Sequence, residues 1–268
     1  MDGALRTRID ALGDGLHRIA LGDGRRAVVK HRRAAPRGFF AMEAHGLGLL
    51  AAAAALRVPA VLAVADDALA LEDLGRGRPG HEAWARAGAG LARLHARHGA
   101  RFGLDRDGWC GAGAQANTPM DDGWRFFAEC RLLPQARRAR DAGLLDARDA
   151  GAVERLCAAL PARVPAQPPS LVHGDLWTAN LHGCADGDLA LIDAAAAHHG
   201  WAETDLAMLT LFGSPPQRFF DAYQAAAGID ARWRGRAGLY NLYHLLNHLN
   251  LFGAGYRDAV RATLAAWA

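Results

Sequence analysis

Strand-like and helix-like segments occupy different parts of this chain, and this segregation restricts its possible folds more than any other feature. Strands are predicted at residues 16–21, 26–30, 60–65 and 68–72. One helix, residues 39–56, lies between the two pairs of strands and ends before Val58-Pro59. Residues 1–74 are therefore expected to form a small β-rich lobe with one main helix.

The rest of the chain has the pattern of helices. A stretch rich in glycine, arginine and proline, residues 75–80, leads into it, and apolar residues then recur at helical spacing. Helices are predicted at residues 82–98, 122–142, 147–160, 202–212, 216–227 and 232–251. The expected fold is α+β and bilobal, and the second lobe, residues 75–268, is the larger and mostly helical one.

Composition argues against several classes of function. The formal net charge is +3 and the arginines are scattered, so a nucleic-acid-binding surface is not expected. The four cysteines form no C-x-x-C pair, which argues against a structural zinc site and for a reducing compartment. We find no secretory signal and no apolar run long enough to span a bilayer. A cytoplasmic protein without a membrane segment is expected, and its oligomeric state stays open.

The segment 171–193 carries the strongest indication of chemistry. Asp186-Gly187, which lies between apolar residues, is predicted to form a two-residue hairpin turn. Such a turn would place Asn180 directly opposite Asp193, with Cβ atoms about 5 Å apart. An amide and a carboxylate that meet in this way are oxygen ligands suited to a hard cation such as Mg²⁺.

Asp175 lies five residues before Asn180 and can face the same point. A base followed by a metal-binding Asn and a strand-borne Asp is the set that phosphoryl transfer uses. An isolated His-x-Asp would more simply be a loop aspartate that caps the backbone, but the added Asn180 and Asp193 favour catalysis. We therefore predict Asp175 to be the catalytic base, and Asn180 and Asp193 to be the metal ligands.

Lys30 and Glu43 are predicted to form the phosphate-binding half of the site. Lys30 is the sole lysine of the chain, ends a predicted strand, and precedes Glu43 in the next helix. A lysine that contacts phosphate and is held by a helix glutamate is typical of kinases. The alternative is a pair of solvated surface side chains.

Two further segments are candidates for nucleotide binding. Gly13 and Gly15 could cover the phosphates, although two glycines around an aspartate are equally an ordinary turn. Glu72 and Leu74, at the end of the small lobe, could present a backbone edge to adenine, and the alternative is a plain edge strand and linker.

These residues, in this order, resemble the aminoglycoside-phosphotransferase and protein-kinase-like fold. The order is Lys30, Glu43, Leu71-Glu72-Asp73-Leu74, His173-Gly174-Asp175-Leu176-Trp177, Asn180 and Ile192-Asp193. Further stretches resemble the fructosamine (ketosamine-3-) kinase family. They are Phe102-Gly103-Leu104, Trp124-Arg125-Phe126-Phe127, residues 129–135, Asp205-Leu206-Ala207-Met208 and residues 243–248.

The resemblance implies ATP- and Mg²⁺-dependent phosphorylation of a sugar hydroxyl on a ketosamine, which is a free or protein-bound glycated amine, in deglycation repair. It places Trp177, His244 and Asn247 in the substrate pocket, and Trp201 is a further candidate for the pocket wall. Two features depart from the family: four alanines follow Asp193 where a proline is usual, and the glycine-rich loop is poorly matched.

Other interpretations stay open. One is a kinase of the same fold that acts on an aminoglycoside or amino alcohol, and another is a nucleotide-binding regulator without turnover. His244 and His248 share a helix face, but without an acidic partner between them we favour pocket lining over zinc. Asp205 is interpreted as a structural helix cap in preference to a brace for the catalytic loop.

Overall fold

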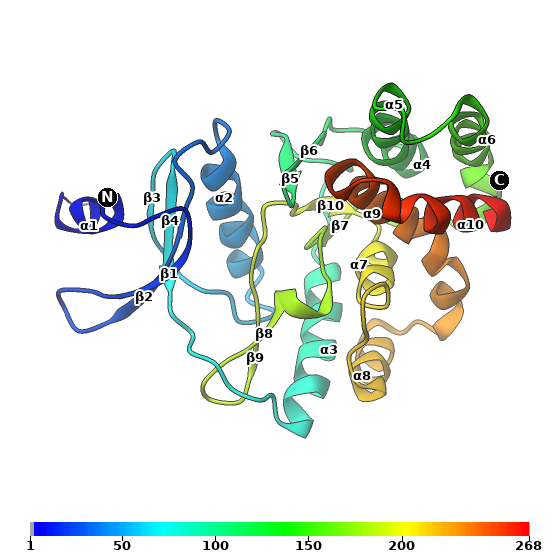
Figure 1. Ribbon diagram of the computed structural model, residues 1–268. Helices are drawn as coiled ribbons and strands as arrows, with labels where there is room; N and C mark the ends of the chain where they lie inside the picture. The colour runs from blue at the N-terminus through cyan, green and yellow to red at the C-terminus, as the bar shows by residue number, and fades with distance from the viewer. Residues whose placement is uncertain (1–2, 268) are drawn as a thin grey trace.

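The computed structural model describes residues 3–267; Met1, Asp2 and Ala268, which the two expected lobes include, lie outside the described residues. A four-stranded antiparallel sheet in the order β1-β2-β4-β3 forms the first part of the molecule. Its strands are β1 (Gly15–Ala20), β2 (Arg26–His31), β3 (Val61–Val64) and β4 (Ala68–Glu72). Helices α1 (Gly3–Asp10) and α2 (Phe39–Ala52) lie on opposite sides of this sheet (Figure 1).

The side chains of β4 point alternately to the two faces of the sheet, and each face is covered by a helix. Ala68 and Ala70 pack with Ile9 of α1, whereas Leu69 and Leu71 belong to the cluster that includes α2. The four predicted strands and the main helix are present. Helix α1 was not predicted, because it is mostly polar and buries one large side chain, Ile9.

Helices dominate the rest of the chain (Figure 1). They are α3 (His81–His95), α4 (Gly123–Phe127), α5 (Leu133–Asp141), α6 (Ala147–Arg163), α7 (Ala202–Met208), α8 (Gln217–Ala227), α9 (Ala237–Phe252) and α10 (Arg257–Trp267). A π-helical turn, Ala128–Leu132, joins α4 to α5, and 3₁₀ turns lie at Thr178–Asn180, Ala231–Arg236 and Ala254–Tyr256. Each predicted helix is present, while α10 lies beyond the last predicted one. The α+β architecture is confirmed.

Short antiparallel strand pairs lie between these helices. The pairs are β5 (Gly108–Cys110) with β6 (Gly113–Gln115), β7 (Ser170–Val172) with β10 (His198–Gly200), and β8 (Leu181–Gly183) with β9 (Leu189–Leu191). No helix within residues 3–267 is long and apolar enough to cross a membrane.

The predicted hairpin forms, but its register differs from the prediction. Leu181 pairs with Leu191, and the amide of Ile192 donates to the carbonyl of Asn180, so the pairing of Asn180 with Asp193 is wrong. The loop has three residues, because Cys184 donates to Asp188 across it, and Gly187 takes the left-handed conformation with φ 82°. A three-residue loop that ends in a left-handed glycine is a common hairpin closure.

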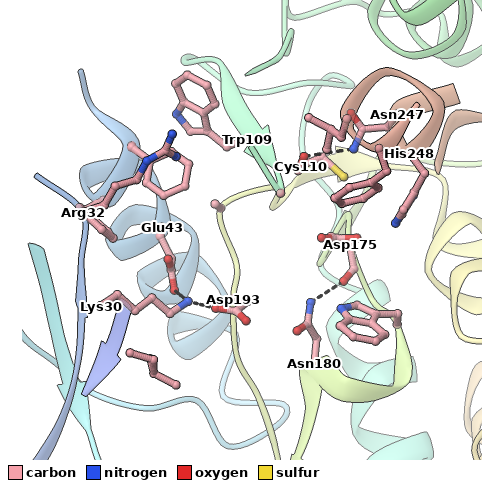
Figure 2. Close-up of a pocket in the computed structure, with 18 of the residues that line it drawn as sticks. Lys30, Arg32, Glu43, Trp109, Cys110, Asp175, Asn180, Asp193, Asn247 and His248 are labelled. Carbon is pink, nitrogen blue, oxygen red and sulfur yellow. Dashed lines mark hydrogen bonds and ion pairs between the residues drawn. The ribbon is translucent and has the colours of Figure 1, made fainter. Parts of the chain in front are cut away.

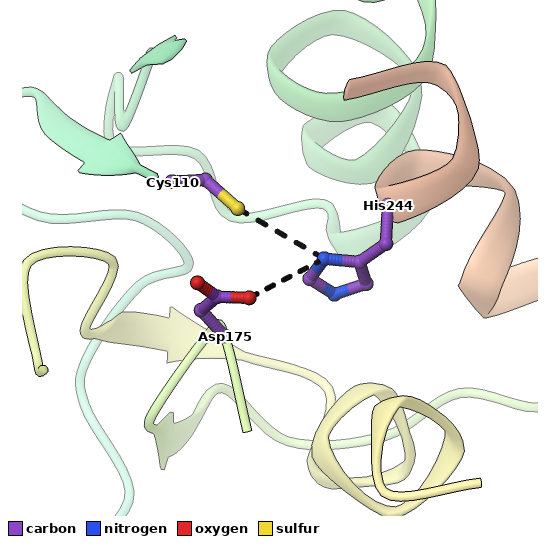
Figure 3. A group of neighbouring side chains, drawn as sticks. All are labelled: Cys110, Asp175 and His244. Atoms are coloured by element: carbon purple, nitrogen blue, oxygen red, sulfur yellow. Dashed lines mark hydrogen bonds and ion pairs between the residues drawn. The ribbon is translucent and has the colours of Figure 1, made fainter. Parts of the chain in front are cut away.

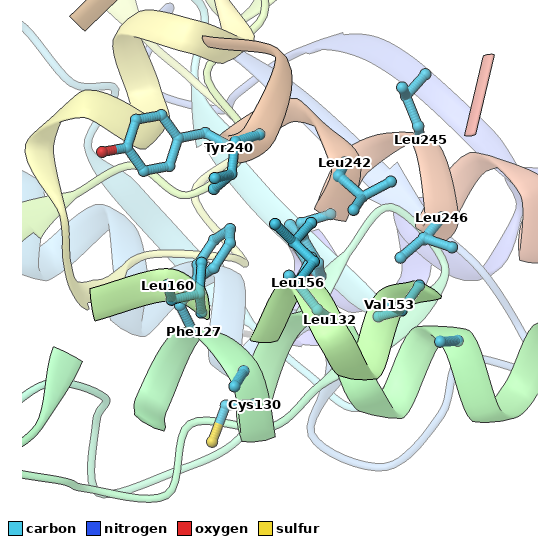
Figure 4. Packing of buried hydrophobic residues seen from close by; sticks show 14 of the residues in the cluster. Phe127, Cys130, Leu132, Val153, Leu156, Leu160, Tyr240, Leu242, Leu245 and Leu246 are labelled. Carbon is cyan, nitrogen blue, oxygen red and sulfur yellow. The ribbon is translucent and has the colours of Figure 1, made fainter. Parts of the chain in front are cut away.

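The largest hydrophobic core joins α4, the π-helical turn, α6 and α9 (Figure 4). Leu132, Leu156, Leu160 and Leu246 are fully buried there. Because α9 is buried along most of its length, it fixes the position of the side chains that it presents to the catalytic loop.

Replacing Leu246 by alanine is expected to lower the free energy of unfolding by about 2–5 kcal/mol, because it leaves a cavity in a packed core. The same truncation at Leu16, which is 61% exposed, should cost less than about 0.5 kcal/mol. Denaturant unfolding measures both values. Equal losses in the two variants would contradict the packing described.

Candidate active site

A cavity of about 550 Å³ lies between the N-terminal sheet with α2 and the helical part of the chain (Figure 2). Lys30 of β2 and Glu43 of α2 line one side of it, and Asp175 and Asn180 line the other. Asp193, which follows β9, lies between the two sides. The cavity therefore brings together the predicted catalytic, phosphate-binding and metal-binding residues.

Lys30 is the centre of a charge cluster in this cavity. Its ammonium lies 2.6 Å from the Glu43 carboxylate and also pairs with Asp193. The Glu43 side chain is buried, and a buried carboxylate needs such a partner. The pair of Lys30 and Glu43 links the sheet to α2, and the contact with Asp193 links both to the segment that follows β9.

Asp193 has a left-handed backbone, with φ 61°, which is uncommon outside glycine but tolerated by aspartate. This backbone conformation directs the Asp193 side chain into the cavity, although Asp193 is not paired with any residue of the β8–β9 hairpin. Its Oδ1 is buried against the Lys30 ammonium, with which it pairs, while 42% of the side-chain surface stays exposed. Asn180 is buried and lines the same cavity, and its Nδ2 donates to the Asp175 carbonyl at 2.8 Å. The amide and carboxylate oxygens of Asn180 and Asp193 fit a hard divalent cation.

The alanines that follow Asp193 pack against backbone on both sides. A Cβ on Gly46 of α2 would overlap the Ala194 carbonyl, and a Cβ on Gly174 would overlap the Ala196 carbonyl. The Ala196 carbonyl also accepts from Gln115 at 3.0 Å and contacts His198 Nδ1 at 2.8 Å. The absence of side chains at Gly46 and Gly174 thus lets this segment pass between α2 and the catalytic loop. These contacts do not explain why alanine follows Asp193 in place of the expected proline.

Asp205 supports the catalytic loop. Its carboxylate accepts the amides of His173 at 2.7 Å and Gly174 at 2.9 Å, and contacts His95 Nε2 at 3.1 Å. Burial acts to raise the pKa of Asp205, but these hydrogen bonds outweigh burial and leave that pKa below its ordinary value. The favoured interpretation of Asp205 as a helix cap is wrong, because its carboxylate oxygens accept hydrogen bonds from the loop before Asp175.

Asp175 lies at the end of this supported loop. Burial raises the pKa of its carboxyl group, and the side chain keeps 20% of its surface exposed toward the cavity. His173 Nε2 contacts the Ile192 carbonyl at 2.8 Å, which ties the loop to the strand before Asp193. The segments that carry the predicted base and the predicted metal ligands are therefore held together by contacts of the His173 and Asn180 side chains with backbone carbonyls.

The predicted nucleotide-binding residues divide between two places. Glu72 and Leu74 line a smaller cavity of about 190 Å³ that also contains Lys30. Gly15 lines the large cavity with φ 132°. Gly13 lines neither of these two cavities, and its carbonyl contacts the ring of His17 at 2.8 Å.

The four predicted substrate residues are also separated. Trp177 lies at the cavity rim, 39% exposed, and buried Asn247 lines the wall. His244 lies behind Asp175, with Nδ1 3.8 Å from the carboxylate. Trp201 does not line the large cavity: it packs in the core with its ring 5.2 Å from that of Phe127.

Several lining residues were not predicted from the sequence. They are Phe39, Trp109, Cys110, Phe212 and Phe252, whereas His248 lines the cavity as favoured from the sequence. The hairpin of β5 and β6 was not predicted, because its strands have three residues each and no alternating pattern marks them. The aromatic residues carried no signal, because an aromatic side chain at helical spacing more often belongs to a core.

The sequence model of the fructosamine kinase family matches residues 14–267. The chain is 39% identical over 242 residues to "Probable ketoamine kinase slr1563" of Synechocystis sp., covering 88% of this chain and 81% of that protein. It is 36% identical over 226 residues to "Probable ketoamine kinase YniA" of Escherichia coli K12, covering 80% and 75%.

Solved structures give the same result. A crystal structure described as "putative fructosamine-3-kinase" from Thermobifida fusca matches with a TM-score of 0.87 and 40% identity, over 94% of this chain and 88% of that one. The gentamicin complex of the phosphotransferase APH(2")-IIa matches with a TM-score of 0.59 over 99% and 95% of the two chains. At 14% identity, the second likeness shows the fold alone.

The support from Asp205 predicts a pH-dependent loss of stability in Asp205→Asn. A carboxylate whose folded pKa is lowered contributes stability that is present above its unfolded pKa, near 3.8, and is lost as the pH falls through the folded value. The difference in unfolding free energy between wild type and Asp205→Asn should be constant above about pH 5 and shrink below pH 4. Urea unfolding at a series of pH values measures it. A difference that grows as the pH falls would contradict the description.

Proposed function

The chain belongs to the fructosamine kinase family, whose members are phosphotransferases with a hydroxyl acceptor, and we propose that its cavity phosphorylates a sugar hydroxyl of a ketosamine with magnesium-ATP. Membership confirms the resemblance stated from the sequence. The protein-kinase-like fold and the prediction of a phosphotransferase are confirmed with it. Use of ATP follows from membership in a kinase family.

One observation carries the proposal: Lys30, Asp175, Asn180 and Asp193 line a single cavity. Phosphoryl transfer depends on positioning and electrostatic stabilisation more than on covalent chemistry by the protein. Lys30, oriented by Glu43, contacts the phosphate oxygens as a compact positive charge. Asp175 accepts the proton of the attacking sugar hydroxyl.

Magnesium is part of the proposal. Asn180 and Asp193 would hold the ion, which would neutralise negative charge on the phosphates. The Asp193 side chain keeps 42% of its surface exposed and lines the same cavity as Asn180, which supports this assignment. The nucleotide base would lie in the smaller cavity beside Glu72 and Leu74, next to Lys30.

The composition of the cavity favours a ketosamine over an aminoglycoside. Aminoglycosides are polycations and call for a surplus of acidic groups. Within residues 3–267 the carboxylates that line this cavity are Glu43, Asp175 and Asp193, each of which already has a role in the proposed transfer. The complete set of Lys30 and the three carboxylates also argues against a regulator without turnover.

The rim of the cavity suggests where the amine substituent of the acceptor lies. Phe252 is 66% exposed and Phe212 41%, and their rings lie 5.2 and 4.9 Å from the ring of His248. Trp177 faces the same cavity. Exposed aromatic side chains around a polar centre suit an acceptor whose sugar enters and whose apolar amine substituent stays at the rim.

An ADP-release assay with magnesium-ATP and a panel of fructosamines, ribulosamines and aminoglycosides tests the proposed function. We expect turnover with at least one ketosamine and none without magnesium. Turnover with aminoglycosides alone would overturn the ketosamine assignment.

Asp175→Asn tests the assigned base. Removing a positioned general base should lower kcat by about 100-fold or more, while ATP affinity stays within about twofold. Steady-state kinetics and calorimetric ATP titration measure the two effects. Asp258→Asn on the distant helix α10 serves as the control and should leave both unchanged. A fully active Asp175→Asn enzyme would remove the mechanism.

Phe252→Ala tests the rim. For a ketosamine with a phenyl-bearing amine, losing about 1 kcal/mol of apolar contact should raise KM about fivefold. The KM for a ketosamine of methylamine should not change, because that substituent does not reach the rim. Ile229→Ala, which truncates an exposed apolar residue outside this cavity, is the matched control. An equal change in KM for the two ketosamines would contradict the placement of the amine substituent at the rim.

A further inference from the structure

Three potential metal-ligand atoms meet beside the proposed base. His244 Nδ1 lies 3.9 Å from Cys110 Sγ and 3.8 Å from Asp175 Oδ1, and the three ligand atoms all lie within 4.8 Å of one another (Figure 3). They come from the end of β5, the loop after β7 and the buried face of α9. Of these three residues, the proposed phosphoryl transfer uses Asp175 alone, so the Cys110 thiol and the His244 imidazole have no role in it.

We propose that Cys110, Asp175 and His244 bind a borderline-soft divalent cation of the zinc type, and that this ion inhibits the enzyme by occupying Asp175. The binding itself does not depend on the proposed function, whereas the inhibition rests on Asp175 being the base.

The spacing of the three atoms is close to that of a zinc site. With zinc–sulfur, zinc–nitrogen and zinc–oxygen distances of about 2.3, 2.0 and 2.0 Å, tetrahedral geometry places the ligand atoms about 3.3–3.6 Å apart. The observed separations of 3.8 and 3.9 Å need to contract by a few tenths of an ångström, and the third, between Cys110 Sγ and the Asp175 carboxylate, is within 4.8 Å. Three protein ligands with a fourth position open to solvent are typical of accessible zinc sites.

The same geometry excludes a nucleophilic triad. In such a triad the thiol and the carboxylate contact opposite nitrogens of the imidazole, so that a proton can pass through the ring. Here both contact Nδ1 of His244. Convergence on one nitrogen does not support proton relay, but it does bring sulfur, nitrogen and oxygen around one point.

Protonation states are compatible with binding. Burial lowers the pKa of His244 to about 3, so the imidazole is neutral at physiological pH. Burial raises the pKa of the Cys110 thiol, so the free protein holds the proton on sulfur. Binding forms a sulfur–metal bond and releases this one proton to solvent. The thiolate and the Asp175 carboxylate then balance the two charges of the ion.

The ligands are held by further hydrogen bonds and are accessible. Asn247 Nδ2 donates to the Cys110 carbonyl at 3.1 Å, and Asn247 Oδ1 accepts from Gln135 Nε2 at 3.1 Å. Cys110 and Asp175 both line the large cavity, which gives the ion a path. Sulfur and nitrogen ligands select zinc-type ions, while magnesium prefers oxygen, so the two ions would occupy different sites.

Cobalt(II) titration of the metal-free protein without nucleotide tests the binding directly. Thiolate ligation of cobalt gives a near-ultraviolet charge-transfer band, and one equivalent of Co²⁺ should produce it in the wild type. Zinc should then displace the cobalt and abolish the band. Cys110→Ser should lose the band, and His244→Asn should weaken binding by at least about tenfold. Cys157→Ser, which removes a half-buried thiol on α6, is the matched control and should titrate like the wild type.

Two spectroscopic outcomes would overturn the site: no charge-transfer band in the wild type, or an undiminished band in Cys110→Ser. Because buried His244→Asn could fail to fold, circular dichroism is recorded for each variant, and Cys110→Ala provides a second test.

Inhibition is measured with buffered free Zn²⁺ at saturating magnesium-ATP, with each variant compared with its own rate in the absence of zinc. The wild type and Cys157→Ser should be inhibited and recover with a chelator, and Cys110→Ser should need at least about tenfold more zinc. A cobalt band without inhibition by zinc would overturn the inhibitory role and leave the binding site in place. Absence of turnover in the wild type with magnesium-ATP and without zinc would instead count against the proposed function.

Discussion

The shared ammonium of Lys30 is the interaction on which the arrangement of the cavity depends. It lies between the buried Glu43 of α2 and Asp193 of the segment that follows β9. Removing it would leave a carboxylate buried without a partner, at a cost of about 3–5 kcal/mol. A lysine suits this place because its compact charge can face two carboxylates and still meet a phosphate, whereas a planar guanidinium imposes a fork.

Close backbone packing keeps this cluster in register with the catalytic loop. Gly46 lets α2 approach the Ala194 carbonyl, and Gly174 lets the loop approach the Ala196 carbonyl. Asp205 then holds the loop amides from the opposite side. The chain therefore positions Asp175 and Asp193 through backbone contacts and one buried carboxylate, and the helical core behind α9 provides the rigid support (Figure 4).

Much of this could be predicted from sequence because the signals are local. The hairpin near Asp186, the loop aspartate and the sole lysine each lie in short stretches whose chemistry can be interpreted without a fold. The hairpin register could not, because Asp186-Gly187 is compatible with a two-residue loop and with a three-residue loop, and Gly187 takes a positive φ in either. Asp205 contacts Gly174, 31 positions away in the sequence, and Cys110 lies near Asp175, 65 positions away, so no local pattern predicts either pair. The sequence around Trp201 is equally compatible with a core position and with a cavity wall.

Identifying the product tests the central claim most directly. The enzyme is incubated with magnesium-ATP and a ketosamine, and the product is analysed by phosphorus NMR and mass spectrometry. The account predicts a phosphomonoester on a sugar hydroxyl, formed in equal amount with ADP and absent when Asp175→Asn replaces the wild type. ADP formed without a phosphorylated sugar, or a phosphorylated sugar formed at the wild-type rate by Asp175→Asn, would contradict it.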